Sequence, residues 1–192
     1  PPEGLALYRD RVDAAAEQLL AAAHGDEAGL RRVVDQYFAS RWADDALLAL
    51  GEIALERGDY GAARGAWEPL VVRPTNPEAA LTWLAYPDTD LDRASILARL
   101  VLVSIVEDSP ERAAMELARF RQEYPRAEGR LGGRTVVLAD ALAELLAASV
   151  DWLPRTSPSD WSTFAGSPTR SRVQPPLGEL GQVLWRRPLP PI

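Results

Sequence analysis

The chain has 192 residues, 47% of them hydrophobic, with 21 basic residues, all Arg, against 28 acidic residues for a net charge of −7. This length and apolar content are enough to bury the core of one domain with an additional segment, which excludes disorder throughout. The acidic balance does not support nucleic-acid binding, which requires a basic face, and the absence of Cys excludes disulfides, zinc ribbons, iron–sulfur clusters and thiol nucleophiles.

Apolar residues recur every three to four positions over the first 149 residues, a spacing that predicts helices. The expected helices span residues 3–23, 27–39, 43–57, 60–71, 77–84, 91–106, 110–123 and 130–149. We expect Asp26, the pair Asp44 and Asp45, and Ser109 to cap three of them, and "EGRLGGRTVV" to start the last. Short connections favour antiparallel neighbours. The predicted fold class is therefore all-α, an array of antiparallel helix hairpins.

One hairpin has a more specific pattern. Counted from Asp44 as position 1, large apolar residues stand at positions 4, 7 and 24 and small ones at 8 and 20: Leu47, Leu50, Trp67, Gly51 and Ala63. This pattern resembles the tetratricopeptide repeat, in which small residues let two helices approach closely. Weaker copies begin at Arg11 and Ala94, the first with Leu30 at a small position. The alternative is an irregular helical domain with one repeat-like hairpin.

The tetratricopeptide resemblance also implies a binding surface, because the first helix of each pair lines a concave face in that family. Carried over to this sequence, the partner-binding positions are Asp45, Leu48, Glu52, Leu55, Glu56, Arg99 and Leu102, with Ser95, Ala98, Ile105 and Val106 beside them. The predicted helix 91–106 is apolar nearly all round and needs a cover. The cover is the helix 130–149, the Trp-bearing C-terminal segment or another protein.

The composition changes near residue 150. Residues 3–149 form the predicted helical domain, and residues 150–192 are rich in Pro, Gly and Ser. The aromatic and glycine spacing in this segment resembles the entry to pyrroloquinoline-quinone-type β-propellers: Trp161, Phe164, Gly166, Arg170, Gly181 and Trp185. The resemblance implies a linker and the first strands of a larger, planctomycete-type envelope or periplasmic protein, with a cytoplasmic location also open. An ordinary Pro-rich linker is the alternative. We expect this segment to be extended, most strand-like over 181–186, and docked on the helices.

No motif indicates catalysis. His24 has no nucleophile beside it and reads as a helix-end residue. The alternating Asp88, Asp90 and Asp92 lack the further ligands of a calcium loop and read as helix caps. We therefore expect no catalytic residue, metal or cofactor. The predicted function is a non-catalytic scaffold that binds a protein partner or its own propeller; the alternative is an accessory domain of a quinone-dependent propeller enzyme.

Two features concern the ends and the environment of the chain. The chain starts with Pro-Pro-Glu rather than Met, so we expect a processed or trimmed start that a signal peptide or lipid anchor could have preceded. The longest apolar run, residues 96–106, is interrupted by Arg99 and is shorter than the ~20 residues of a membrane span. We expect no direct membrane span.

Overall fold

The computed structural model describes residues 2–71 and 85–152 of the chain. The chain divides into two units, residues 1–152 and 153–192, and all described residues belong to the first. Its elements, in chain order, are α1 (Pro2–Ala23), α2 (Glu27–Tyr37), α3 (Ala43–Glu56), α4 (Tyr60–Val71), α5 (Arg93–Val106), α6 (Pro110–Glu123), β1 (Glu128–Leu131), β2 (Arg134–Val137) and α7 (Leu138–Ser149). The described part of the chain is thus mostly helical, as predicted.

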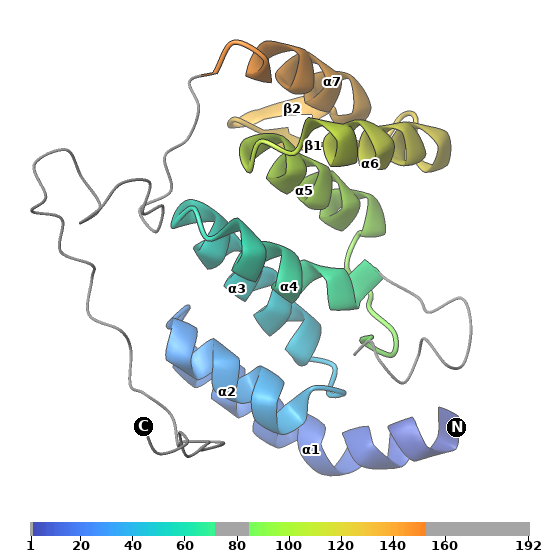
Figure 1. Ribbon diagram of the computed structural model, residues 1–192. Helices are drawn as coiled ribbons and strands as arrows, with labels where there is room; N and C mark the ends of the chain where they lie inside the picture. The colour runs from blue at the N-terminus through green and yellow to red at the C-terminus, as the bar shows by residue number, and fades with distance from the viewer. Residues whose placement is uncertain (1, 72–84, 153–192) are drawn as a thin grey trace, which may run out of the picture. The chain divides into compact units, whose positions relative to one another are not determined.

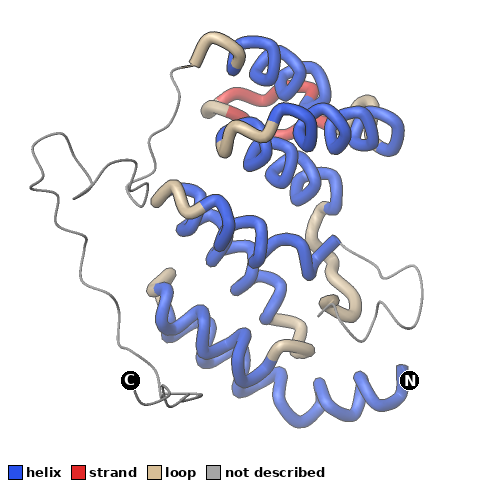
Figure 2. The backbone as a smooth tube through the Cα atoms, in the orientation of Figure 1, coloured by secondary structure: helices blue, strands red, loops and turns tan. Residues whose placement is uncertain are grey.

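Consecutive helices pair as antiparallel hairpins, α1 with α2, α3 with α4, and α5 with α6 (Figures 1 and 2). Each hairpin packs on the next, because α2 contacts α3 and α4 contacts α5. The helices α2, α4 and α6 lie on one side and their partners α1, α3 and α5 on the other (Figure 1). The predicted array of helix hairpins is therefore present in the described residues.

The close packing of α3 against α4 depends on one glycine, Gly51. A Cβ atom placed on Gly51 would lie 2.0 Å from the Nε1 atom of Trp67, so only glycine fits beneath the indole ring. Trp67 is fully buried and its Nε1 donates a hydrogen bond to the Leu48 carbonyl oxygen at 3.1 Å. Ala63, one turn earlier on α4, is also fully buried. The large and small positions identified in the sequence thus meet inside this hairpin.

The α1–α2 hairpin makes its close contact beside the repeat's small position, which Leu30 occupies. Its tightest approach is at Gly29, where an added Cβ would lie 2.6 Å from the Ala23 Cβ atom. Leu30, at the position matched to Ala63, is buried instead among side chains of α1, α2 and α3. The close contact therefore lies one residue earlier than the repeat alignment predicted.

Two predicted caps are confirmed and two are not. Asp26 caps α2 by accepting from the Gly29 N–H, and the helix after residue 91 begins behind Asp92, which accepts from two backbone N–H groups. The prediction for Asp44 and Asp45 is wrong: α3 begins one residue before them, behind Trp42. Ser109 stands at the N-cap position of α6 but makes no capping hydrogen bond there. An early start leaves Asp44 and Asp45 in the first turn, where acidic groups favour the helix dipole.

The prediction of one helix over 130–149 is wrong for its first part. Residues 128–137 form the antiparallel pair β1–β2, and α7 begins only at Leu138. Gly132 and Gly133 both have positive φ, 57° and 78°, and form a two-residue turn that such glycines favour. The β-branched residues that follow suit a strand better than a helix. The sequence "EGRLGGRTVV" is therefore a β-hairpin.

Helix α5 is covered from within the described residues. It contacts α4, α6 and α7, and its buried side chains include Val101, Val103 and Ile105. Of the three covers considered from the sequence, the segment 130–149 supplies this one, through α7. The predicted helix 77–84 and the predictions for residues 153–192, including the strand-like piece 181–186, lie outside the described residues.

Candidate interaction site

Four of the seven predicted partner-binding residues line one pocket of about 120 Å³ between α3 and α5. Glu52 and Leu55 come from α3, and Arg99 and Leu102 come from α5. The other walls come from the first turns of α5, from β1 and from α7: Ser95, Ala98, Gly129, Arg130, Leu131, Leu138 and Leu142. Three helices and one strand therefore meet at this point.

The pocket has an apolar floor and a charged rim. Leu138 and Leu142 are 4% and 1% exposed, and both belong to the core shared by α5, α6 and α7. At the rim, the Arg99 Nε donates to the Glu52 Oε1 at 2.5 Å, and the Arg99 Nη1 donates to the Ser95 carbonyl oxygen at 3.1 Å. An apolar cavity of about 150 Å³ accommodates a benzene-sized group. The pocket therefore has room for one aliphatic side chain beside a fixed charge pair.

The other three predicted residues lie along α3 outside this pocket. Asp45 and Glu56 are exposed, near the two ends of the helix. Partial removal from water, together with the nearby carboxylates of Asp44 and Asp90, raises the pKa of Asp45. Leu48 is half-buried against the central core. Asp45 and Glu56 therefore extend the acidic side of the surface, and Leu48 contributes packing.

Two positions named beside the predicted site are almost fully buried, although Ala98 also forms part of the pocket wall. Ala98 and Ile105 are 6% and 2% exposed and pack in the core with α6 and α7. The repeat alignment alone does not show this, because the cover on α5 comes from residues that follow the hairpin.

Sequence reasoning missed the contribution of β1. The residues from Gly129 to Leu131 were expected at the start of a helix, whereas they form the strand that borders the pocket. The signal that identifies them is the Gly-Gly pair followed by a short run with β-branched residues, Thr135 to Val137, because such a pair is typical of a two-residue hairpin turn.

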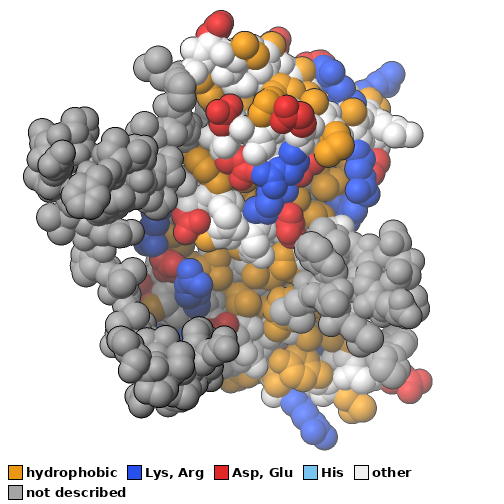
Figure 3. Space-filling view, in the orientation of Figure 1, with side chains coloured by type: hydrophobic (Ala, Val, Ile, Leu, Met, Phe, Trp, Pro, Cys, Tyr) orange, Lys and Arg blue, Asp and Glu red, His pale blue; other side chains and the backbone are white. Residues whose placement is uncertain are grey.

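A second pocket, of about 260 Å³, lies between α2 and α4. Hydrophobic side chains gather on this face around α4 and toward α2 (Figure 3). Three of the charges at its rim are paired with one another, because Glu27 accepts from both Arg31 and Arg57. These hydrogen bonds, from Arg31 first, lower the pKa of Glu27. Compared with the α3–α5 pocket, this one includes no predicted binding residue.

A buried polar cluster ties α1 to the start of α3 and to the loop before α5. Arg9, 8% exposed, donates its Nε to the Ala39 carbonyl oxygen at 3.1 Å and pairs with Asp88. The Thr89 hydroxyl donates to the Asp44 Oδ2 at 2.7 Å. Burial raises the pKa of Asp44, and burial likewise raises the pKa of Tyr86, whose hydroxyl donates to the Ser40 carbonyl oxygen. Each group has a structural partner, so this cluster holds the fold.

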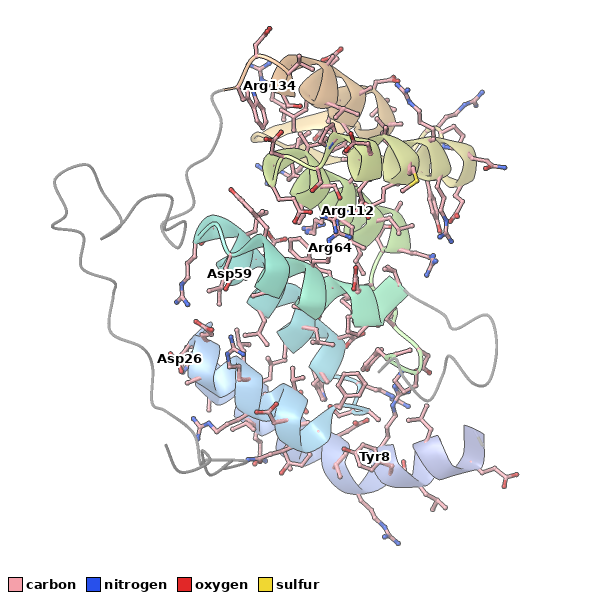
Figure 4. The ribbon with its side chains drawn as sticks, in the orientation of Figure 1. Tyr8, Asp26, Asp59, Arg64, Arg112 and Arg134 are labelled. Atoms are coloured by element: carbon pink, nitrogen blue, oxygen red, sulfur yellow. The ribbon has the colours of Figure 1, made fainter. Side chains whose placement is uncertain are left out.

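A charged joint connects the α3–α4 hairpin to α5 and α6. Arg64 of α4 donates to the Glu116 Oε1 at 2.9 Å, to the Leu100 carbonyl oxygen at 3.1 Å and to the Ser104 hydroxyl (Figure 4). The Ser104 hydroxyl donates in turn to the Glu116 Oε2 at 2.7 Å. The Arg64 side chain is only 12% exposed. This network fixes how the two hairpins stack.

The described residues contain no cluster of three or more His, Asp or Glu side chains placed to hold a metal ion. Of Asp88, Asp90 and Asp92, which were expected to be helix caps, Asp92 caps α5, whereas Asp88 pairs with Arg9. His24 follows α1 with a positive φ of 47° and is exposed. In the part of the chain that the structure describes, no helix is long and apolar enough to cross a membrane.

In comparisons with known proteins, no family model, no curated protein and no solved structure matches this chain.

Proposed function

We propose that this protein is a non-catalytic interaction scaffold and that it binds a segment of another polypeptide at the pocket between α3 and α5. The observation that carries the proposal is the convergence of Glu52, Leu55, Arg99 and Leu102 on one small pocket. These positions were selected from the sequence by their resemblance to a repeat family whose members bind partners on this helix face. Their convergence supports the proposal.

The chemistry of the pocket suits recognition of a side chain rather than catalysis of a reaction. Its apolar floor accepts one aliphatic group, and its rim pairs a guanidinium with a carboxylate at 2.5 Å. Interface hot spots combine such an apolar anchor with polar groups that fix its orientation. The partner segment is therefore expected to insert one aliphatic residue between α3 and α5.

The proposal also includes the location of this scaffold and the domain that follows it. The resemblance of residues 161–185 to a propeller entry supports a place in the bacterial cell envelope, with a following propeller as a second platform. A tetratricopeptide-like assignment of the three hairpins likewise rests on the sequence pattern and on the Gly51–Trp67 contact.

Peptide selection tests the binding surface directly. The full chain is used to select binders from a random peptide display library, and the affinities of the selected peptides are then measured for the native chain and for Leu102→Glu. We expect this substitution to weaken binding by at least about 2 kcal/mol, roughly 30-fold, because it puts a charge at the mouth of an apolar pocket.

The matched control is Met115→Glu on α6. Met115 is 69% exposed, so the same kind of apolar-to-acidic change is made outside the pocket. Peptides that bind Leu102→Glu as tightly as the native chain would place the binding surface elsewhere. Failure to select any peptide would also contradict the proposal, provided that far-ultraviolet circular dichroism shows a folded chain.

A further inference from the structure

The strand that borders the candidate pocket has a free edge. Among the residues that the structure describes, 2–71 and 85–152, the sheet has two strands, so β1 has β2 on one side and no described strand on the other. The pocket between α3 and α5 is bordered by Gly129, Arg130 and Leu131 of β1 and by no residue of β2. The open edge of β1 therefore belongs to the same surface as the pocket.

The register of the hairpin shows which backbone groups point outward. The Leu138 N–H donates to the Ala127 carbonyl oxygen at 2.9 Å, which makes this a hydrogen-bonded pair. Hydrogen-bonded and non-hydrogen-bonded pairs alternate along antiparallel strands. Arg130, paired with Thr135, is thus a non-hydrogen-bonded position, as is Glu128. Their backbone N–H and C=O groups point away from β2.

These outward groups are unused in the part of the chain that the structure describes. No backbone hydrogen bond outside the hairpin involves Glu128 or Arg130 there. An open row of such donors and acceptors is a template for another strand, and strand addition is an established way of binding extended peptides.

The charge of the hairpin indicates what kind of strand fits. Residues 126–134 contain three Arg, at 126, 130 and 134, against Glu128, which gives +3 − 1 = +2 in a chain whose net charge is −7. All four side chains are exposed, and none forms an ion pair with another residue that the structure describes. An acidic strand therefore complements this edge.

Resting on the proposed function, we infer that the partner segment is an extended strand of alternating acidic and aliphatic residues that adds antiparallel to the free edge of β1. An acidic residue opposite Arg130 shares its face of the sheet and meets its guanidinium. The neighbouring aliphatic residues then lie on the face of Gly129 and Leu131, which borders the pocket. Backbone hydrogen bonds hold the strand, and the pocket selects the side chain.

The test uses the full chain and a labelled heptapeptide of alternating Glu and Leu, with fluorescence anisotropy as the readout. Two N-methylated versions separate strand addition from simple docking. In the antiparallel register the Glu N–H groups face β1 and the Leu N–H groups face away. We expect methylation of the Glu nitrogens to weaken binding at least about tenfold and methylation of the Leu nitrogens to change it less than about twofold.

A pair of protein variants tests the same edge from the other side. Arg130→Pro removes the outward N–H of β1, and Thr135→Pro removes the outward N–H of β2 at the directly paired position. We expect only Arg130→Pro to weaken the affinity for the peptide, by at least about tenfold. Because that variant also removes a positive charge, Arg130→Gln serves as its control and retains the discrimination between the two methylated peptides. Saturating peptide should slow hydrogen exchange of the Arg130 amide and leave that of Thr135 unchanged.

Equal affinities for the two methylated peptides, or equal losses in the two Pro variants, would overturn strand addition. Absence of binding by the unmethylated peptide up to about 1 mM would overturn it as well. If library-selected peptides still depend on Leu102 in any of these cases, the proposed binding surface stands and only the strand mode is wrong. A peptide of alternating Lys and Leu that binds as well as the acidic one would contradict the charge argument.

Discussion

The hairpins α3–α4 and α5–α6 follow the same plan but fill their interiors differently. In the first, Gly51 leaves the space that the indole of Trp67 occupies. At the equivalent positions 50 residues later, the second has Val101 and Leu117, which are 1% and 5% exposed. A very small and a very large residue are thus replaced by two of intermediate size. Tight packing constrains the combined volume of facing side chains more than the residue type at either position.

The two hairpins also differ in their surroundings. The first is held at its end by the buried Asp44, which binds the Thr89 hydroxyl, whereas the equivalent position in the second is Ala94. The second is covered by α7, which continues from β2. The first hairpin is therefore stabilised by the contact between Gly51 and Trp67 and by the hydrogen bond of Asp44, and the second by the packing of α7 against it.

The largest effect is expected from emptying the core of the first hairpin. Trp67→Ala should lower the free energy of unfolding by about 3–5 kcal/mol, because it leaves a cavity and removes the hydrogen bond from Nε1 to the Leu48 carbonyl oxygen, while Leu117→Ala should cost about 2–3 kcal/mol. Urea denaturation measures both. A loss below about 1 kcal/mol for Trp67→Ala would show that the hairpin does not depend on this contact.

The joint between the hairpins is expected to come next. Arg64→Met removes a guanidinium that serves Glu116, Ser104 and the Leu100 carbonyl, and should cost about 2–3 kcal/mol. Arg119→Met is the control, since the ion pair of Arg119 with Glu123 is exposed and should contribute less than about 0.5 kcal/mol. Similar losses for the two variants in denaturant would mean that the joint is no more than a surface ion pair.

Adding one methyl group at Gly51 tests the close packing between α3 and Trp67 of α4. Gly51→Ala should lower the free energy of unfolding by about 1–3 kcal/mol, because its Cβ overlaps the Trp67 ring. Gly65→Ala, within α4 and with nothing within 4 Å of the added Cβ, should instead raise it by about 0.5–1 kcal/mol. Thermal melts of the two variants should therefore shift in opposite directions.

The smallest effect is expected from the buried carboxylate that only the first hairpin contains. Burial raises the pKa of Asp44, so protonation favours the fold; this contribution is complete below the unfolded value of about 3.9 and is lost as the pH rises through the folded pKa. Asp44→Asn imitates the protonated form. Its advantage over the native chain should be larger at pH 7 than at pH 4. An advantage independent of pH, measured by urea denaturation at both values, would contradict the shift.

Much of the fold follows from local pattern. The expected helices 3–23, 60–71 and 110–123 agree with α1, α4 and α6 within one residue, because apolar periodicity and turn residues act over a few positions. The hairpin β1–β2 was missed although Gly132 and Gly133 mark it. Each strand has only four residues, and the Ala- and Leu-rich helix α7 follows β2 directly. The helical pattern of α7 therefore extends too far toward the N-terminus when it is read from the sequence.

The amino-acid sequence by itself determined the helical class, most helix boundaries, the small position at Gly51 and the large one at Trp67, and four of the residues at the candidate pocket. Only the tertiary structure decided that β1 borders that pocket, that Arg64 bridges two hairpins, and that Asp44 is buried beneath Thr89. The reason is the separation along the chain. Periodicity records what each helix buries on its own face, whereas these contacts join groups far apart in the sequence, 52 residues for Arg64 and Glu116 and 45 for Asp44 and Thr89, which meet only after the hairpins have stacked.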